Sequence, residues 1–149
     1  MMMSPMLIAG YAVAYGVAYE DYDKVVGVGD VVGQGAFAAL LAKGDFRPQM
    51  LLSHEGEPIG QWLDFQEDDI GLLAIGSIDR TSPRGLLASQ MVESGEIKGL
   101  STNMCGLARP IAGTKSRVCV QVFKSREISL ATNPSNPMAR LLSFTAGTA

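Results

Sequence analysis

His54 is the one histidine of the chain, so a general base that titrates near neutral pH has to be this residue. It follows the apolar, strand-like run Met50-Leu51-Leu52-Ser53 and precedes the turn-like run Glu55-Gly56-Glu57-Pro58. At the end of a strand, the side chain would be held by the sheet and could still reach a surface cleft. A histidine in an exposed turn, without a catalytic role, fits the same local sequence.

Ser101 supplies a hydroxyl that could act as a nucleophile. Strand alternation in the run 99–103 places Ser101 on one face with Gly99 and Asn103, away from Leu100 and Thr102. The glycine would let a substrate backbone approach this face closely. A strand serine with a solvated hydroxyl is the alternative that local sequence favours, because the run is not a Gly-x-Ser-x-Gly nucleophile elbow.

Glu127 could orient the imidazole as the third member of a triad. It begins the run 127–131, in which Glu127 and Ser129 point to one face while Ile128 and Leu130 point to the other. An exposed strand charge explains the same local pattern.

The elements that must position these residues are mainly strands. Glycine, with 17 residues, repeatedly separates short runs rich in Val, Ile, Leu and aromatic residues, a pattern typical of strands joined by turns. The sequence therefore predicts a compact mainly β fold with a few helices, of the α+β class. The predicted strands are 7–19, 25–32, 49–53, 59–66, 71–78, 98–104, 117–123 and 127–131.

Three helices are predicted around these strands. Ser82 can cap a helix that begins at Pro83, has Val92 and Glu93 near its end and stops at Gly95. A second helix, 136–144, would be capped by Asn136 and begin at the following proline. The third is an Ala- and Leu-rich segment, 36–43.

Composition narrows the function classes. A chain of 149 residues, 47% hydrophobic and 18% charged, indicates a single globular domain spanning 1–149 with its core in about 7–144. The net charge of -3 and the absence of a Lys/Arg cluster argue against direct nucleic-acid binding.

The apolar start, 6–19, is too short for a bilayer span and is interrupted by glycines, so no membrane association is expected. Cys105 and Cys119 are too few for a disulfide framework and indicate a reduced, cytoplasmic protein.

Two further motifs carry no site. The glycines of 27–33 lack dinucleotide-binding spacing and are followed by no phosphate-binding Lys-Ser/Thr, so a turn between strands is expected there. The acidic run 67–69 lacks companion ligands at calcium-loop spacing and is interpreted as a solvated turn. Neither a metal nor a cofactor is therefore expected.

Taken together, these residues resemble the prohead protease family of tailed bacteriophages, over roughly residues 7–140. Ser101 follows His54 by 47 residues, and the order and spacing of several short runs make the combination specific. Those runs are Ile8-Ala9-Gly10-Tyr11-Ala12-Val13, Gly35-Ala36-Phe37, Leu51-Leu52-Ser53-His54, Ile59-Gly60, Gly71-Leu72, Gly99-Leu100-Ser101, Glu127-Ile128-Ser129-Leu130 and Asn133-Pro134-Ser135-Asn136-Pro137.

The resemblance implies a β-barrel surrounded by helices, as in herpesvirus assemblin proteases. It implies His54 as general base, Ser101 as nucleophile and Glu127 in the third position, which the herpesvirus enzymes fill with a second histidine. An oxyanion hole is also needed, and backbone N–H groups in a glycine-containing loop after Ser101, or near Arg126, are the candidates.

The implied function is serine endopeptidase activity during capsid maturation. Substrates would be scaffold and major capsid protein segments, and the chain itself, inside the assembling procapsid in the cytoplasm of the bacterial host. A homo-oligomer is expected. The alternative is a catalytically inactive barrel of the same family that acts as an assembly or scaffold-binding factor.

Overall fold

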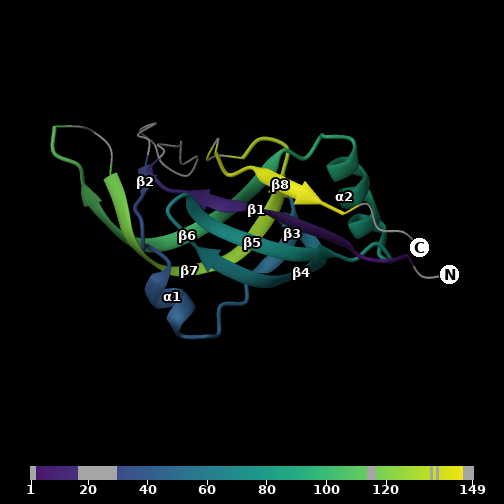
Figure 1. Cartoon of the computed structure of the whole chain (residues 1–149), viewed down its shortest axis with the longest axis horizontal. Helices are drawn as coiled ribbons and strands as arrows, with labels where there is room; N and C mark the ends of the chain where they lie inside the picture. The colour runs from purple at the N-terminus through teal and green to yellow at the C-terminus, as the bar shows by residue number, and fades with distance from the viewer. Residues whose placement is uncertain (1–2, 17–29, 114–116, 135, 137, 146–149) are drawn as a thin grey trace.

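The computed structural model describes residues 3–16, 30–113, 117–134, 136 and 138–145. Its elements confirm the mainly β fold with few helices (Figure 1). In chain order they are β1 (Met6–Ala14), β2 (Asp30–Val32), α1 (Ala38–Ala42), β3 (Gln49–Leu52), β4 (Glu55–Glu67), β5 (Gly71–Ile78), α2 (Pro83–Glu93), β6 (Gly99–Pro110), β7 (Arg117–Ala131) and β8 (Leu141–Phe144). The predicted strand residues 17–19 and 25–29 lie outside the described residues.

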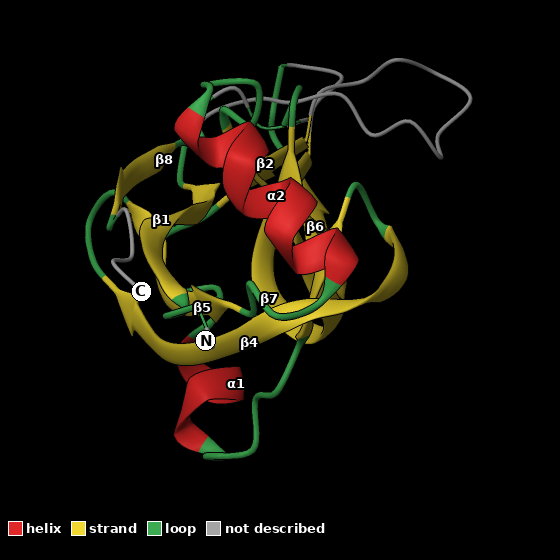
Figure 2. Ribbon diagram, turned by 90° about the vertical axis from the view of Figure 1, so that its right-hand side faces the viewer, coloured by secondary structure: helices red, strands yellow, loops and turns green. Residues whose placement is uncertain are grey.

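One mixed sheet contains the eight strands of the described residues, in the order β2-β7-β3-β4-β5-β1-β8, with β6 paired to β7 off this path. β2 and β3 run parallel to β7, whereas the other pairs are antiparallel. Seen from the direction of Figure 2, the strands curve around a common centre.

The gap between β6 and β1 is bridged by residues 139–141. The Leu100 amide donates to the Ala139 carbonyl at 2.9 Å, and the Tyr11 amide donates to the Arg140 carbonyl at 3.0 Å. These bonds join β6 to the β1–β8 end of the strand order and close the sheet into a barrel.

Apolar side chains that alternate along the strands fill the centre of the barrel. In β5, every second residue from Leu72 to Ile78 is buried, which is the period of a strand with one face on the core. Burial of each large apolar side chain stabilises the fold by about 1.5–3 kcal/mol. The fully buried large side chains are Phe37, Met6, Met50, Ile59, Leu72, Ile78, Leu100, Ile128, Leu130, Val13, Val32 and Val122.

Helix α2 has the predicted ends. The Ser82 hydroxyl accepts a hydrogen bond from the Gly85 amide at 3.0 Å, Pro83 is the first helical residue, and Gly95 has a φ of 82° beyond the last turn. The helix packs on β4 and β5, while α1 lies well apart from it beside β7 (Figure 2). The third prediction, 36–43, is confirmed as the shorter helix α1.

The predicted helix at 136–144 is wrong, because residues 141–144 form β8. Ile8 pairs with Phe144 and Gly10 pairs with Leu141, so this segment supplies the hydrogen-bond partners that the outer edge of β1 would otherwise lack. Asn136 does not cap a helix: its side chain donates to the Ala14 carbonyl at 2.9 Å and accepts from the Met138 amide. Sheet pairing outweighs the local helix signal here.

Two predicted strands, 117–123 and 127–131, are parts of the single strand β7, whose first half extends with β6 as a long hairpin (Figure 1). The acidic run 67–69 lies at the turn between β4 and β5, where Asp68 accepts a hydrogen bond from the Tyr11 hydroxyl at 2.6 Å.

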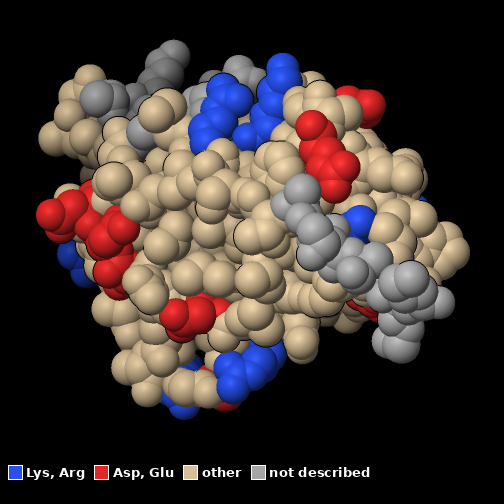
Figure 3. Space-filling model, turned by 45° about the vertical axis from the view of Figure 1, so that its right-hand side comes forward, with Lys and Arg blue, Asp and Glu red and all other residues tan. Residues whose placement is uncertain are grey.

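On the face shown in Figure 3, Lys and Arg occur in small separate groups around a largely uncharged centre. None of the helices in the described ranges has the length and apolar character needed to cross a bilayer.

Candidate active site

The turn between β3 and β4 places His54 beside β7. Because β3 runs parallel to β7 with Leu52 opposite Leu130, the chain leaves β3 next to the end of β7. The Ser53 amide continues this contact by donating to the Leu130 carbonyl at 3.0 Å. Leu52 then pairs with Glu55, so Ser53 and His54 alone make the connection and turn the imidazole back toward β7.

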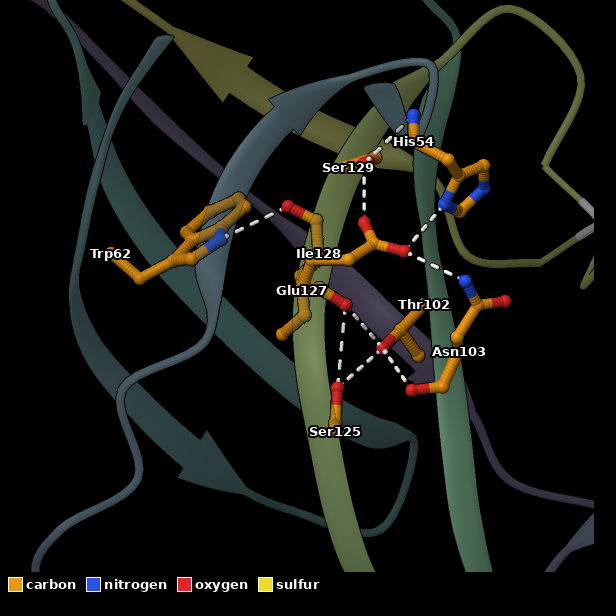
Figure 4. A network of polar contacts seen from close by, with 8 residues as sticks. All are labelled: His54, Trp62, Thr102, Asn103, Ser125, Glu127, Ile128 and Ser129. Carbon is orange, nitrogen blue, oxygen red and sulfur yellow. Dashed lines mark hydrogen bonds and ion pairs between the residues drawn. The ribbon is translucent and has the colours of Figure 1, made fainter. Parts of the chain in front are cut away.

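His54 and Glu127 are in direct contact, with 2.6 Å between Nδ1 and Oε1 (Figure 4). A carboxylate accepts hydrogen bonds, so Nδ1 carries the proton and Nε2 of the neutral ring keeps a free lone pair. The hydrogen bond to Glu127 raises the pKa of His54 above its usual 6.5, partial burial opposes this rise, and the negative charge of Glu127 adds to it. The arrangement is that of a base whose charged form is stabilised by its partner.

A β-bulge sets the position of Glu127 in β7. Between the pairs Thr102–Ile128 and Met104–Ser125, β6 contributes one residue while β7 contributes two, Arg126 and Glu127. The Glu127 carbonyl at this irregularity accepts hydrogen bonds from the hydroxyls of Thr102, at 2.7 Å, and Ser125, at 3.3 Å.

Two polar side chains hold the Glu127 carboxylate in addition to His54. The Asn103 amide nitrogen donates to Oε1 at 3.0 Å, and the Ser129 hydroxyl donates to Oε2 (Figure 4). Glu127 is only 7% exposed, and these donors compensate its carboxylate for the water lost on burial. Both oxygens are therefore fixed in direction.

Ser101 lies on the same face of the β6–β7 ladder as this network. It pairs directly with Ser129, is 7% exposed, and borders a narrow pocket that also includes Ala12, Val13 and Asn136. Among the described residues, no hydrogen bond joins the Ser101 hydroxyl to His54. The structure therefore brings His54 and Glu127 into contact. It places Ser101 opposite Ser129, which follows Glu127 by two residues in β7.

The residues after Ser101 do not form the glycine-containing loop expected as an oxyanion site. They continue β6 as far as Pro110, because β7 is long enough to pair with them along the hairpin. Arg126, the other candidate position, lies in the bulge beside Glu127.

Asn103 and Ser129 were not predicted to be part of the site. The sequence contains a signal for both residues, since strand alternation puts Asn103 on the face of Ser101 and Ser129 on the face of Glu127. What was missing was the pairing of the two strands, which brings these faces together. Within the described ranges, no group of three or more His, Cys, Asp or Glu side chains is arranged to hold a metal ion.

Comparison with known proteins supports this architecture. The chain is similar to the protease of KSHV, a herpesvirus, whose crystal structure contains a hexapeptide phosphonate inhibitor; the TM-score is 0.54 at 12% sequence identity. The match covers 95% of this chain, which spans 65% of the length of the herpesvirus protease chain. No curated protein matches the chain.

A protein-family model gives the more specific result. The model described as caudovirus prohead serine protease matches residues 3–145, which is nearly the entire sequence. The barrel, with His54 and Glu127 in contact on its surface, therefore belongs to a member of the caudovirus prohead serine protease family.

Proposed function

We propose that this chain is a serine endopeptidase that cleaves scaffold and coat-protein segments, and itself, inside the assembling procapsid. His54 is the general base, Ser101 the nucleophile and Glu127 the carboxylate that orients His54. The observation that carries the proposal is the 2.6 Å contact between His54 Nδ1 and Glu127 Oε1, on the face of the sheet to which Ser101 belongs.

The residues divide the reaction between them. Nε2 of His54 takes the proton of Ser101 as the serine oxygen forms a bond to the peptide carbonyl carbon. The carbon–nitrogen bond then breaks, and the same proton passes from His54 to the departing amine. Water hydrolyses the acyl-enzyme by the reverse sequence of proton transfers. Glu127 keeps Nδ1 protonated throughout and stabilises the imidazolium. Catalytic hydrogen bonds are often long in the free enzyme and tighten when substrate binds, so the Nε2–Ser101 bond is expected to form in the substrate complex.

An extended peptide suits the surroundings of Ser101. From Ser101 onward, β6 pairs with β7 along one edge, and no described strand hydrogen-bonds to its other edge. A substrate segment that added to this edge as a strand would run its backbone past the nucleophile.

Cavity positions also favour an extended substrate over a small molecule. Cavities of about 460 and 330 Å³ are lined by other residues and include none of His54, Ser101 and Glu127. Small-molecule hydrolases enclose most of their substrate in a pocket. The candidate site instead suits a chain that lies across the surface.

The test is co-expression with the neighbouring coat and scaffold proteins, comparing the wild type with Ser101→Ala. Cleaved capsid proteins are expected only with the wild type. A matched control is Ser89→Ala, which removes another buried hydroxyl, bonded to the Leu86 carbonyl of α2. Cleavage by Ser101→Ala at the wild-type level would refute the assignment of the nucleophile.

A substrate-independent measurement separates the enzyme from an inactive barrel. A fluorophosphonate probe forms an oxygen–phosphorus bond with an activated serine and expels fluoride, and intact-mass spectrometry detects the adduct. We expect one adduct on the wild type, at Ser101, and none on Ser101→Ala. If the wild type neither reacts nor cleaves, the inactive assembly factor becomes the better description.

A further inference from the structure

The turn that carries His54 has an unusual backbone conformation. Ser53 and His54 have φ angles of 53° and 64°, the left-handed region that glycine adopts readily and other residues avoid. Two-residue hairpin turns of this kind normally contain Asn-Gly or Asp-Gly. Neither position is glycine here, so neighbouring groups must hold the turn in place.

Those groups come from two elements packed against the turn. From α2, the Arg84 guanidinium donates to the carbonyls of Leu52 and Glu55, which flank the turn, at 3.4 and 3.2 Å. From β7, the Ser129 hydroxyl accepts a hydrogen bond from the His54 amide at 3.1 Å. The Ser53 amide also donates to the Leu130 carbonyl of β7, but within the described part of the chain the bond to Ser129 is the one that acts on the backbone of His54 itself.

The same Ser129 hydroxyl donates its proton to Oε2 of Glu127. A hydroxyl has one proton to donate and two lone pairs, so these two bonds occupy the donor and one acceptor position. Ser129 is completely buried, and no water competes for either bond. One oxygen atom therefore connects the backbone of His54 to the carboxylate that binds its ring (Figure 4).

We propose that Ser129 is a positioning residue that fixes the imidazole of His54 and the carboxylate of Glu127 relative to each other. The catalytic part of this inference rests on the proposed function, whereas the geometric part does not. Without the hydroxyl, the His54 amide loses its bond to β7, and Oε2 of Glu127 loses the Ser129 donor, while the Ser53 amide keeps its bond to the Leu130 carbonyl. The imidazole and the carboxylate are then held less firmly relative to each other, because only their direct contact joins them. A buried serine that only satisfied its own hydrogen bonds would not change the state of His54.

His54 gives a direct readout because its signal is the one histidine resonance of the chain in an NMR titration. We expect Ser129→Ala to lower the pKa of His54 toward its usual value, since contact with Glu127 is what raises it. The rate of fluorophosphonate labelling at Ser101 should fall by at least about tenfold. Ser89→Ala, the matched loss of a buried hydroxyl in α2, should leave both quantities at the wild-type value.

Two results would overturn the proposal: a His54 pKa in Ser129→Ala that is equal to or above that of the wild type, or an unchanged labelling rate. If Ser129→Ala does not fold, Ser129→Cys keeps a side chain of similar shape with a weaker donor, and the same two criteria apply to it. Absence of labelling in the wild type would refute the protease proposal but not the geometric one, because the titration needs no activity.

Discussion

Replacing Glu127 with glutamine tests whether the negative charge of this carboxylate is needed for the reaction of Ser101. The amide has nearly the same shape, and its oxygen can still accept from His54 Nδ1 and from Asn103 if it lies at the Oε1 position. Its NH2 group would face Ser129, whose hydroxyl oxygen can accept a second hydrogen bond. The substitution therefore removes the negative charge and largely preserves the packing.

The size of the effect follows from the lost attraction between carboxylate and imidazolium. Two unit charges about 4 Å apart attract by about 4 kcal/mol at the effective dielectric constant of ~20 found near protein surfaces. The side chain of His54 is 37% exposed, and screening by solvent reduces this attraction to about 2 kcal/mol. Loss of that amount from the transition state slows the reaction by about 30-fold.

Fluorophosphonate labelling of Ser101, followed by intact mass across a pH series, measures both consequences. On the alkaline plateau, Glu127→Gln should react about 30-fold more slowly than the wild type. Its acid limb should lie at lower pH, because the burial that lowers the pKa of His54 remains, while the hydrogen bond to a neutral amide is weaker and the negative charge of Glu127 is lost.

The control is Glu96→Gln, which removes an exposed carboxylate between α2 and β6. It should change neither the plateau labelling rate nor the pH of the acid limb. Circular dichroism would establish that both variants are folded. A Glu127→Gln variant with the wild-type plateau and the wild-type acid limb would remove Glu127 from the catalytic centre.

Three other outcomes are expected. The rate of wild-type labelling should decline on acidification through the pKa of His54, which lies above 6.5. The same raised pKa adds to the free energy of unfolding below pH 6.5, and this contribution is lost as the pH rises through the folded-state pKa. Urea unfolding of the wild type and of His54→Gln across that pH range would detect the loss. Gly85→Ala should lower the melting temperature although alanine favours helices by about 1 kcal/mol, because its Cβ would lie 1.8 Å from the Asp79 carbonyl oxygen; a higher melting temperature would contradict this contact. Trp62→Phe should lower the free energy of unfolding by about 1–3 kcal/mol, measured in urea, because the buried indole N–H donates to the Ile128 carbonyl at 3.2 Å; an unchanged value would contradict the reasoning.

Elements with strong local signals were predictable from the sequence. β5 has the predicted bounds, 71–78, because an apolar run is flanked by polar, turn-forming residues at both of its ends. The capping serine, the first-turn proline and the terminal glycine did the same for α2. Each signal acts between residues a few positions apart, where local conformation decides the structure.

Elements whose conformation depends on distant partners were not predictable in this way. Residues 141–144 are a strand because β1 has an open edge, about 130 positions earlier in the chain. Residues 124–126, which are polar and look like a break, continue β7 because β6 pairs with Lys124 and Ser125, and Arg126 lies in the bulge of β7. The sequence contains both partners but not their pairing.

The candidate site shows the same limit at the level of single residues. The position of His54 at a strand end was evident from the apolar run before it, whereas its left-handed backbone was not, since the turn lacks the glycine that normally marks this conformation. The family resemblance, rather than local sequence, indicates Ser101 and Glu127. Their local sequences favour ordinary strand residues.

The central position of β7 explains why these residues meet. β7 pairs with β6 on one side and β3 on the other, so the strand that contains Glu127 lies between the strand of Ser101 and the turn of His54. A slip of one residue in either pairing would turn Glu127 to the opposite face of the sheet. The bulge lies before Ile128, so that the pairing of Ser129 with Ser101 is regular and Glu127 stays on their face of the sheet. The register of β7 therefore positions the candidate site as directly as the identities of its residues do.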